Sequence, residues 1–149
     1  TTLAGWICAP LILVFGIYVV LHATVTPGGG FQGGAIAASG LALGFVAGGY
    51  HAWRRLARSP VLAAMEAAGA LLFIGSGLAV MAVGGAFMEN RLPLGKAGDI
   101  LSGGIMVTEN LGVGLAVCAA FLMLFLEFLE ETRTRKPAEE PDPDGEGAS

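Results

Sequence analysis

The sequence predicts an all-α membrane protein in which four transmembrane helices are joined by short loops and followed by a disordered acidic C-terminal tail. Composition is the first reason, because 54% of the 149 residues are hydrophobic and only 13% are charged, against about 25% charged in soluble domains. The second reason is that the charge gathers in clusters, at 54–58, at 89–99 and from 127 onward. The apolar stretches between these clusters are long enough for helices that cross roughly 30 Å of hydrocarbon.

Each apolar stretch is expected to form one helix of a transmembrane domain that covers residues 1–131. The first stretch is rich in Leu, Ile and Val, and Trp6 and Tyr18 lie near its ends, where they suit the membrane interface. It is too long for an ordinary signal-peptide core, so we expect a retained helix. Pro10 can kink this helix, which neighbouring helices tolerate in a membrane. The four helices are expected at 3–22, 33–53, 61–87 and 103–128.

Local signals place some helix ends and leave one open. Ser59 is a good N-cap, and Pro60 suits the first position of the third helix. The fourth helix begins somewhere between Asp99 and Ile105, and the sequence does not choose between these limits. Residues 132–149 are charged and rich in Pro, Gly and Asp, so they cannot bury enough surface to fold. We expect them to form a disordered cytoplasmic tail.

Small residues recur every four positions in two of the predicted helices. This spacing lines them up along one helix face, where another helix can approach closely. The second and fourth helices are therefore expected to pack through two stripes of small residues, namely Gly40, Gly44 and Gly48, and Gly112, Ala116 and Ala120.

The distribution of Lys and Arg predicts the orientation, because cytoplasmic loops carry the excess of these residues. Only Arg91 and Lys96 lie on one side. The other side has six such residues, namely Arg54, Arg55, Arg58, Arg133, Arg135 and Lys136. We therefore expect a multi-pass protein of the plasma membrane with both termini in the cytoplasm.

Ionisable side chains inside a membrane cost roughly 2.5–3.5 kcal/mol on insertion scales, so each one is a functional candidate. Glu66, in the first turns of the third helix, is a candidate proton or cation relay; alternatively, the helix N-terminus and nearby Arg58 stabilise its charge. Glu109 and Asn110 lie in the fourth helix, at a depth that depends on where this helix begins. They are candidates for the ion pathway or for hydrogen bonds to a partner. His22 can pass protons near neutral pH, or can simply be solvated at the interface.

Other classes of function find no support in the sequence. It contains no nucleophile–base arrangement, no metal-ligand spacing and no basic patch for nucleic acid, so we expect neither an enzyme nor a cofactor. Cys8 and Cys118 lie in apolar stretches and are expected to be small buried hydrophobes. The glycine-rich segment after the first helix has no Lys followed by Ser or Thr and does not follow a strand, so it is not a nucleotide-binding loop.

This glycine-rich segment is expected to be a tight hairpin loop between the first two helices. Its residues are Pro27, Gly28, Gly29, Gly30, Phe31, Gln32, Gly33 and Gly34. In this position the segment resembles the signature of the MnhB/MrpB family, the B subunits of Mrp-type multisubunit Na⁺/H⁺ antiporters, which has relatives in membrane-bound hydrogenase-type complexes. The segments 98–104 and 110–115 add weaker similarity, and the resemblance extends from about Leu3 to Glu131.

The resemblance implies a cofactor-free subunit that lies in the bilayer among other hydrophobic subunits of a complex exchanging Na⁺ for H⁺. Such a subunit would help to assemble the complex and could contribute to the ion pathway. The alternative is a structural or ion-translocating subunit of a redox-driven complex related to complex I or to membrane-bound hydrogenases. A freestanding four-helix channel is disfavoured, because so few polar residues line no obvious pore.

Overall fold

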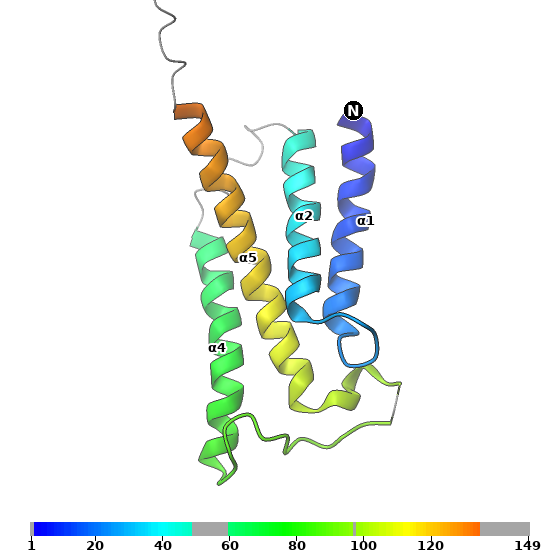
Figure 1. The fold of residues 1–149 in the computed structure, drawn as a ribbon, viewed down its shortest axis with the longest axis vertical. Helices are drawn as coiled ribbons and strands as arrows, with labels where there is room; N and C mark the ends of the chain where they lie inside the picture. The colour runs from blue at the N-terminus through cyan, green and yellow to red at the C-terminus, as the bar shows by residue number, and fades with distance from the viewer. Residues whose placement is uncertain (1, 49–59, 97, 135–149) are drawn as a thin grey trace, which may run out of the picture.

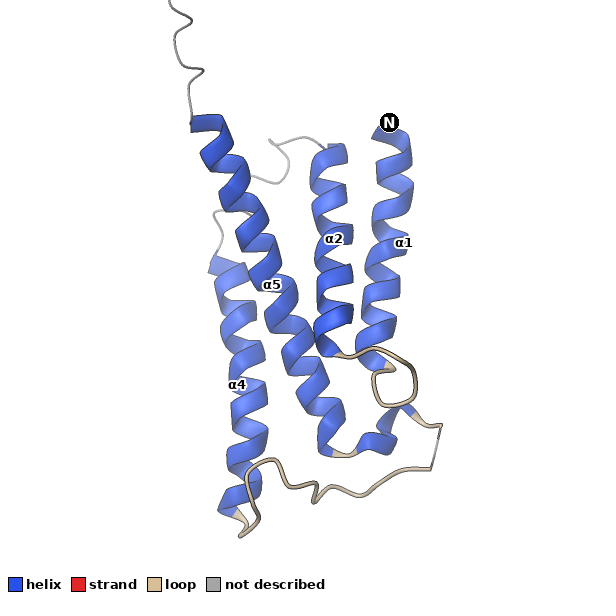
Figure 2. Ribbon diagram, in the orientation of Figure 1, coloured by secondary structure: helices blue, strands red, loops and turns tan. Residues whose placement is uncertain are grey.

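The computed structural model describes residues 2–48, 60–96 and 98–134, and these residues form helices and loops without any strand (Figure 2). The α-helices are α1 (Thr2–Leu21), α2 (Gly30–Gly48), α4 (Pro60–Ala82) and α5 (Ile105–Thr134), and a short 3₁₀ helix, η1 (Ile100–Gly103), precedes α5. All four α-helices are long and apolar enough to cross a membrane, which confirms the predicted fold class.

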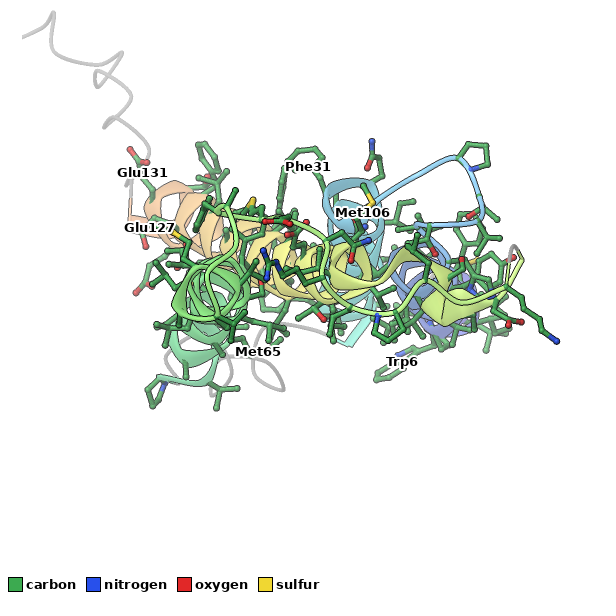
Figure 3. All side chains as sticks on the ribbon, turned by 90° about the horizontal axis from the view of Figure 1, so that it is seen from below. Trp6, Phe31, Met65, Met106, Glu127 and Glu131 are labelled. Atoms are coloured by element: carbon green, nitrogen blue, oxygen red, sulfur yellow. The ribbon has the colours of Figure 1, made fainter. Side chains whose placement is uncertain are left out.

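The four helices lie side by side in a row, in the order α4, α5, α2 and α1 (Figure 1). Helix α2 packs against α1 and α5, and α5 also packs against α4. The view along the helices shows one flat layer rather than a four-cornered bundle (Figure 3). Of the most apolar stretch of each helix, 44% is buried in α2 but only 17% in α4, because α4 has a neighbour on one side only.

Small residues let the backbones of α1 and α2 approach closely. A methyl group at Gly16 would lie 2.5 Å from the backbone nitrogen of Ala37, and one at Gly40 would lie 2.7 Å from that of Leu13. Gly44 is also buried, and Gly48 is half-buried. In a membrane this close packing matters more than apolar burial, since lipid tails are as apolar as the side chains.

The contact between α4 and α5 is built in the same way. Gly69 of α4 faces the carbonyl oxygen of Gly112 and the backbone nitrogen of Ala116 on α5. Ala120, the third member of the predicted stripe, is half-buried. Gly69 was not singled out from the sequence, although it provides the α4 side of this crossing.

Several helix ends differ from the predicted ones. Helix α4 ends at Ala82 instead of residue 87, because Gly84 leaves the helical conformation with a φ of +81°. Two hydrogen bonds of 3.0 Å close the helix: Gly85 N–H donates to the Val80 carbonyl, and Gly84 N–H donates to the Met81 carbonyl. This is the Schellman motif that commonly ends helices at glycine.

The N-terminus of α5 resolves the alternative left open by the sequence. Helix α5 begins at Ile105, and Gly104, with a φ of +58°, separates it from η1. At its other end α5 continues to Thr134, so the expectation that the tail begins at residue 132 is wrong. Some predictions fall outside the described residues, namely those for 135–149, for the arginines of the 54–58 cluster, for Ser59 and for the end of the second helix at 49–53.

Loops 22–29 and 83–104 gather at one end of the layer, which we call the motif end. The chain leaving α4 passes along this end toward α1 and returns through η1 to α5 (Figure 1). Thr24 donates a hydrogen bond to the Ile100 carbonyl (3.2 Å), which ties the two loops together. Asn90 accepts a hydrogen bond from the backbone N–H of Ile105 (3.2 Å) and thereby caps α5.

Candidate functional site

The glycine motif lies at the N-terminus of α2 and is only partly a loop. Pro27, Gly28 and Gly29 precede the helix, but α2 begins at Gly30, so the prediction of a loop as far as Gly34 is wrong. In the first turns of α2, Gly33 packs against Val20 of α1, while Gly34 lies against the Gly114 carbonyl of α5. The glycines of the motif therefore allow the N-terminal end of α2 to pack closely against both α1 and α5. Phe31 and Gln32 remain exposed. The rings of Phe31 and Phe121 pack in an edge-to-face arrangement, with their centroids 6.1 Å apart.

Asn110 explains why α2 begins where it does. Its side-chain oxygen accepts a hydrogen bond from the backbone N–H of Gly30 (2.8 Å), and its amide donates one to the Met106 carbonyl (2.9 Å). Asn110 therefore acts as an N-cap for a helix that lies 80 residues away in the sequence. The predicted coordinating amide is thus engaged on both sides within the chain, and we do not assign it to an ion.

Glu109 lies in the first turns of α5 and is half-buried. One of its carboxylate oxygens, Oε1, is buried without a hydrogen-bond partner, and no other buried side-chain oxygen or nitrogen in the described part of the chain shares this condition. Glu109 precedes Gly112 by three residues and Ala116 by seven, so it lies on the face of α5 that packs against α4.

Glu66 is a half-buried residue of α4 near the opposite end of the layer. It precedes Gly69 by three residues and therefore also lies toward α5. Since Gly69 faces Gly112 and Ala116, a rise of 1.5 Å per residue separates Glu66 from Glu109 by roughly 9–15 Å along the helix axis. The structure therefore places both candidate carboxylates on one helix–helix contact but does not bring them together. Arg58, the expected partner of Glu66, lies outside the described residues.

His22 follows the last residue of α1 and takes part in closing this helix. Its Nδ1 is 3.1 Å from the Tyr18 carbonyl, to which it can donate, and its ring stacks on Tyr18 with the centroids 4.0 Å apart. Thr26 donates a hydrogen bond to the His22 carbonyl (3.0 Å). These contacts give His22 a structural role at the end of α1.

An apolar groove of about 260 Å³ lies between α1, α2 and α5. Its walls carry apolar side chains and glycines only, contributed by Leu13, Ile17, Val20, Leu21, Gly34, Ala37, Leu41, Met65, Leu111, Gly114, Leu115 and Cys118. Met65, at its edge, lies at the same face of the layer as Trp6, whereas Phe31 projects from the other face (Figure 3). Such a groove offers an ion no polar side chain as a ligand.

The fold and these residues define a class of protein: a membrane protein whose described residues form four helices long and apolar enough to span a bilayer, arranged as an open layer. Residues 2–123 match the model of a family described as a domain related to the MnhB subunit of Na⁺/H⁺ antiporter. The chain belongs to this MnhB family, which confirms the resemblance seen in the glycine motif.

One relative adds to this assignment. The chain is 35% identical over 121 residues to an uncharacterized protein of Methanocaldococcus jannaschii, and the match covers 73% of this chain and 44% of that protein. The chain therefore spans less than half the length of this relative.

Proposed function

We propose that the chain is a non-catalytic membrane subunit of a multisubunit Na⁺/H⁺ antiporter complex, in which it holds neighbouring subunits together. Membership of the MnhB family over residues 2–123 is the observation that carries this proposal. The open layer supports it, because a single row of helices encloses no path, and the path must then be completed by other subunits. We further propose that the complex lies in the plasma membrane, with both termini of this chain in the cytoplasm.

The outward side of α4 is the best candidate for a contact with another subunit. Exposed small residues follow one another along it, namely Ala64, Ala68, Gly75 and Ala79. Small residues are typical of helix–helix contacts in membranes. A methyl group at Gly75 would meet no atom of the described residues within 4 Å, so the position is open to a helix from outside.

The exposed side of α1 has a different character. It carries large apolar residues, including Leu3, Ile7, Leu11 and Phe15, which suit contact with lipid tails. Large apolar residues are exposed on α4 as well, namely Val61, Leu71, Ile74, Leu78 and Met81. The line of small residues is therefore the feature on which we assign the α4 edge to a partner subunit and the α1 edge to lipid.

The test compares a large substitution at each edge. Gly75→Leu should prevent a partner helix from approaching α4, so the complex should be lost from native gels and Na⁺-driven proton movement should be lost from inverted vesicles. Ala4→Leu is the matched control, because Ala4 is an exposed small residue on α1. Assembly of the Gly75→Leu complex at the level of the control would refute the assignment of the α4 edge. Absence of Na⁺/H⁺ exchange in the intact wild-type complex would refute the proposed function itself.

A further inference from the structure

The apolar groove between α1, α2 and α5 has an exposed rim and a buried floor. Ile17, Leu21 and Leu111 at the rim are exposed, whereas Ala37 and Cys118 at the floor are buried. Side chains that line an unfilled depression lose van der Waals contacts on that side. In a bilayer the groove is therefore expected to hold an apolar group from outside the chain.

The groove extends over only part of the depth of the membrane. Its lining runs from Leu13 to Leu21 on α1 and from Leu111 to Cys118 on α5. At the helical rise per residue both stretches are roughly 10–12 Å long, against roughly 30 Å for the hydrocarbon core. Leu21 is the last residue of α1, and Leu13 lies near the middle of this helix. The groove therefore begins near the motif end, ends near the middle of the layer and lies within one leaflet.

This position fits a lipid chain better than a helix of another subunit. A spanning helix crosses the whole hydrocarbon core, so the groove would match only part of it, whereas an acyl chain begins at the membrane surface and ends near the midplane. The large side chains at the rim, Ile17, Leu21 and Leu111, would also hold a helix backbone away. The helix contacts within this chain are instead built on small residues, such as Gly69 against Gly112.

The size and lining of the groove also suit an alkyl chain. An apolar cavity of about 150 Å³ holds one benzene molecule, and the groove has a volume of about 260 Å³. No aromatic ring and no charged side chain occurs among the residues that line it, so a flat ring system would find no stacking partner and a lipid headgroup no ionic partner there. The groove is thus suited to the hydrocarbon part of a lipid alone.

We propose that the groove binds one acyl chain of a membrane lipid from the leaflet at the motif end. The ester end of the chain lies near Leu21 and Leu111, and its methyl end lies near Leu13 and Cys118. With both termini in the cytoplasm, as proposed above, this is the outer leaflet. The inference goes beyond the proposed function and does not depend on it, because the lining belongs to this chain and no transported ion takes part.

Photoreactive lipids locate the bound chain in the assembled complex. Phosphatidylcholine with a diazirine on one acyl chain is incorporated into vesicles that contain the complex, which is then transferred to detergent and washed. Irradiation releases N₂, and the resulting carbene inserts into a neighbouring bond of the protein, where mass spectrometry locates the adduct. Adducts retained on the groove-lining peptides should exceed those at Leu3 and Ile7 of the α1 edge about fivefold, which corresponds to about 1 kcal/mol of tighter binding.

Two positions of the diazirine determine the direction of the chain. A diazirine near the ester should label the groove close to Leu21 and Leu111. A diazirine near the methyl end should label it close to Leu13 and Cys118. The opposite order would assign the chain to a lipid of the other leaflet and contradict the proposal.

Two substitutions on α5 test whether the groove itself holds the lipid. Leu115 is half-buried in the lining, so Leu115→Trp should fill part of the groove and lower the retained adducts on α1 about fivefold, the same 1 kcal/mol. Leu124→Trp is the matched control, because Leu124 is exposed and lies nine residues further along, on the opposite side of the helix. It should leave the adducts unchanged. Native gels establish that each variant assembles, and the wild-type labelling decides the question if Leu115→Trp does not.

Three further results would overturn the proposal. Absence of adducts in the groove of unwashed wild-type vesicles, with Leu3 and Ile7 labelled, would show that another subunit covers the groove. Equal loss of adducts from the groove and from the α1 edge on washing would identify ordinary boundary lipid. Unchanged labelling in an assembled Leu115→Trp complex would place the lipid elsewhere. None of these readouts uses Na⁺/H⁺ exchange, so failure of the proposed function is recognised separately, as a wild-type complex without exchange.

Discussion

Two glycines of α4 allow the close contact between α4 and α5 to be measured. A methyl group at Gly69 would lie 2.5 Å from the Gly112 carbonyl oxygen and 2.6 Å from the Ala116 nitrogen. A methyl group at Gly75 would meet nothing within 4 Å in the part of the chain that the structure describes. In Gly69→Ala the helices must separate by about 1 Å to restore ordinary van der Waals contact. Forcing an additional methyl group into a packed contact costs about 1–3 kcal/mol.

The comparison between the two variants isolates this cost. Each variant replaces a glycine inside the same helix, so a gain of up to about 1 kcal/mol in helix propensity is common to both and cancels. Gly69→Ala should therefore be about 1–3 kcal/mol less stable than Gly75→Ala. For a chain of this length the difference corresponds to a Tm lower by roughly 2–12 °C.

The assay is thermal unfolding of the purified chain in detergent, followed by far-UV circular dichroism. The isolated chain is used because Gly75 is open there, while the assembled complex should place another helix against it. Equal Tm values for the two variants, or a higher value for Gly69→Ala, would show that α4 and α5 do not touch through Gly69.

Two further predictions concern the motif end. Asn110→Ala removes the acceptor for the Gly30 N–H, so amide hydrogen exchange at the start of α2 should become faster. The increase should correspond to about 0.5–2 kcal/mol, the usual contribution of an N-cap to stability. Unchanged exchange would exclude the cap. The Ala86 N–H and the Arg91 guanidinium hold the pKa of Glu89 below its ordinary value of 4.5. The stabilisation from Glu89 should therefore be present above pH 4.5 and be lost as the pH falls through the pKa of the folded state. Protection of the Ala86 amide from hydrogen exchange should accordingly be greater in the wild-type chain than in Glu89→Gln only at the higher pH.

The number of helices and their approximate spans could be predicted from the sequence because they depend on length and hydropathy alone. The end of α4 was also visible in principle, since Gly84 and Gly85 are adjacent and form the Schellman motif. The start of α2 was not, because its cap is Asn110, which lies 80 residues away in the sequence. Helix ends fixed by distant side chains cannot be read from local sequence.

In the candidate site, too, the sequence identified some features, while others depend on contacts between distant residues. The cost of burying a charge singled out Glu109, and the adjacent Asn110 was proposed as a coordinating amide; the structure gives the two residues different surroundings. Asn110 has both polar groups engaged, while Glu109 has a buried oxygen without a partner. Only the direction of each side chain around α5 separates these roles: Asn110 reaches α2 and Glu109 lies toward α4. The sequence identifies both residues as candidates but does not show which neighbouring helix each one faces.

The order of the helices explains how a single chain places Glu109 next to an edge of the layer. Helices α2 and α5 pack side by side and both begin at the motif end, so their connection must cross the membrane once in the opposite direction. Helix α4 makes this crossing and packs on the far side of α5, where it has no further neighbour within the described chain. Glu109 is therefore separated by one helix from the edge that we assign to a partner subunit. This position distinguishes Glu109 from Asn110 and His22, which take part in closing α2 and α1.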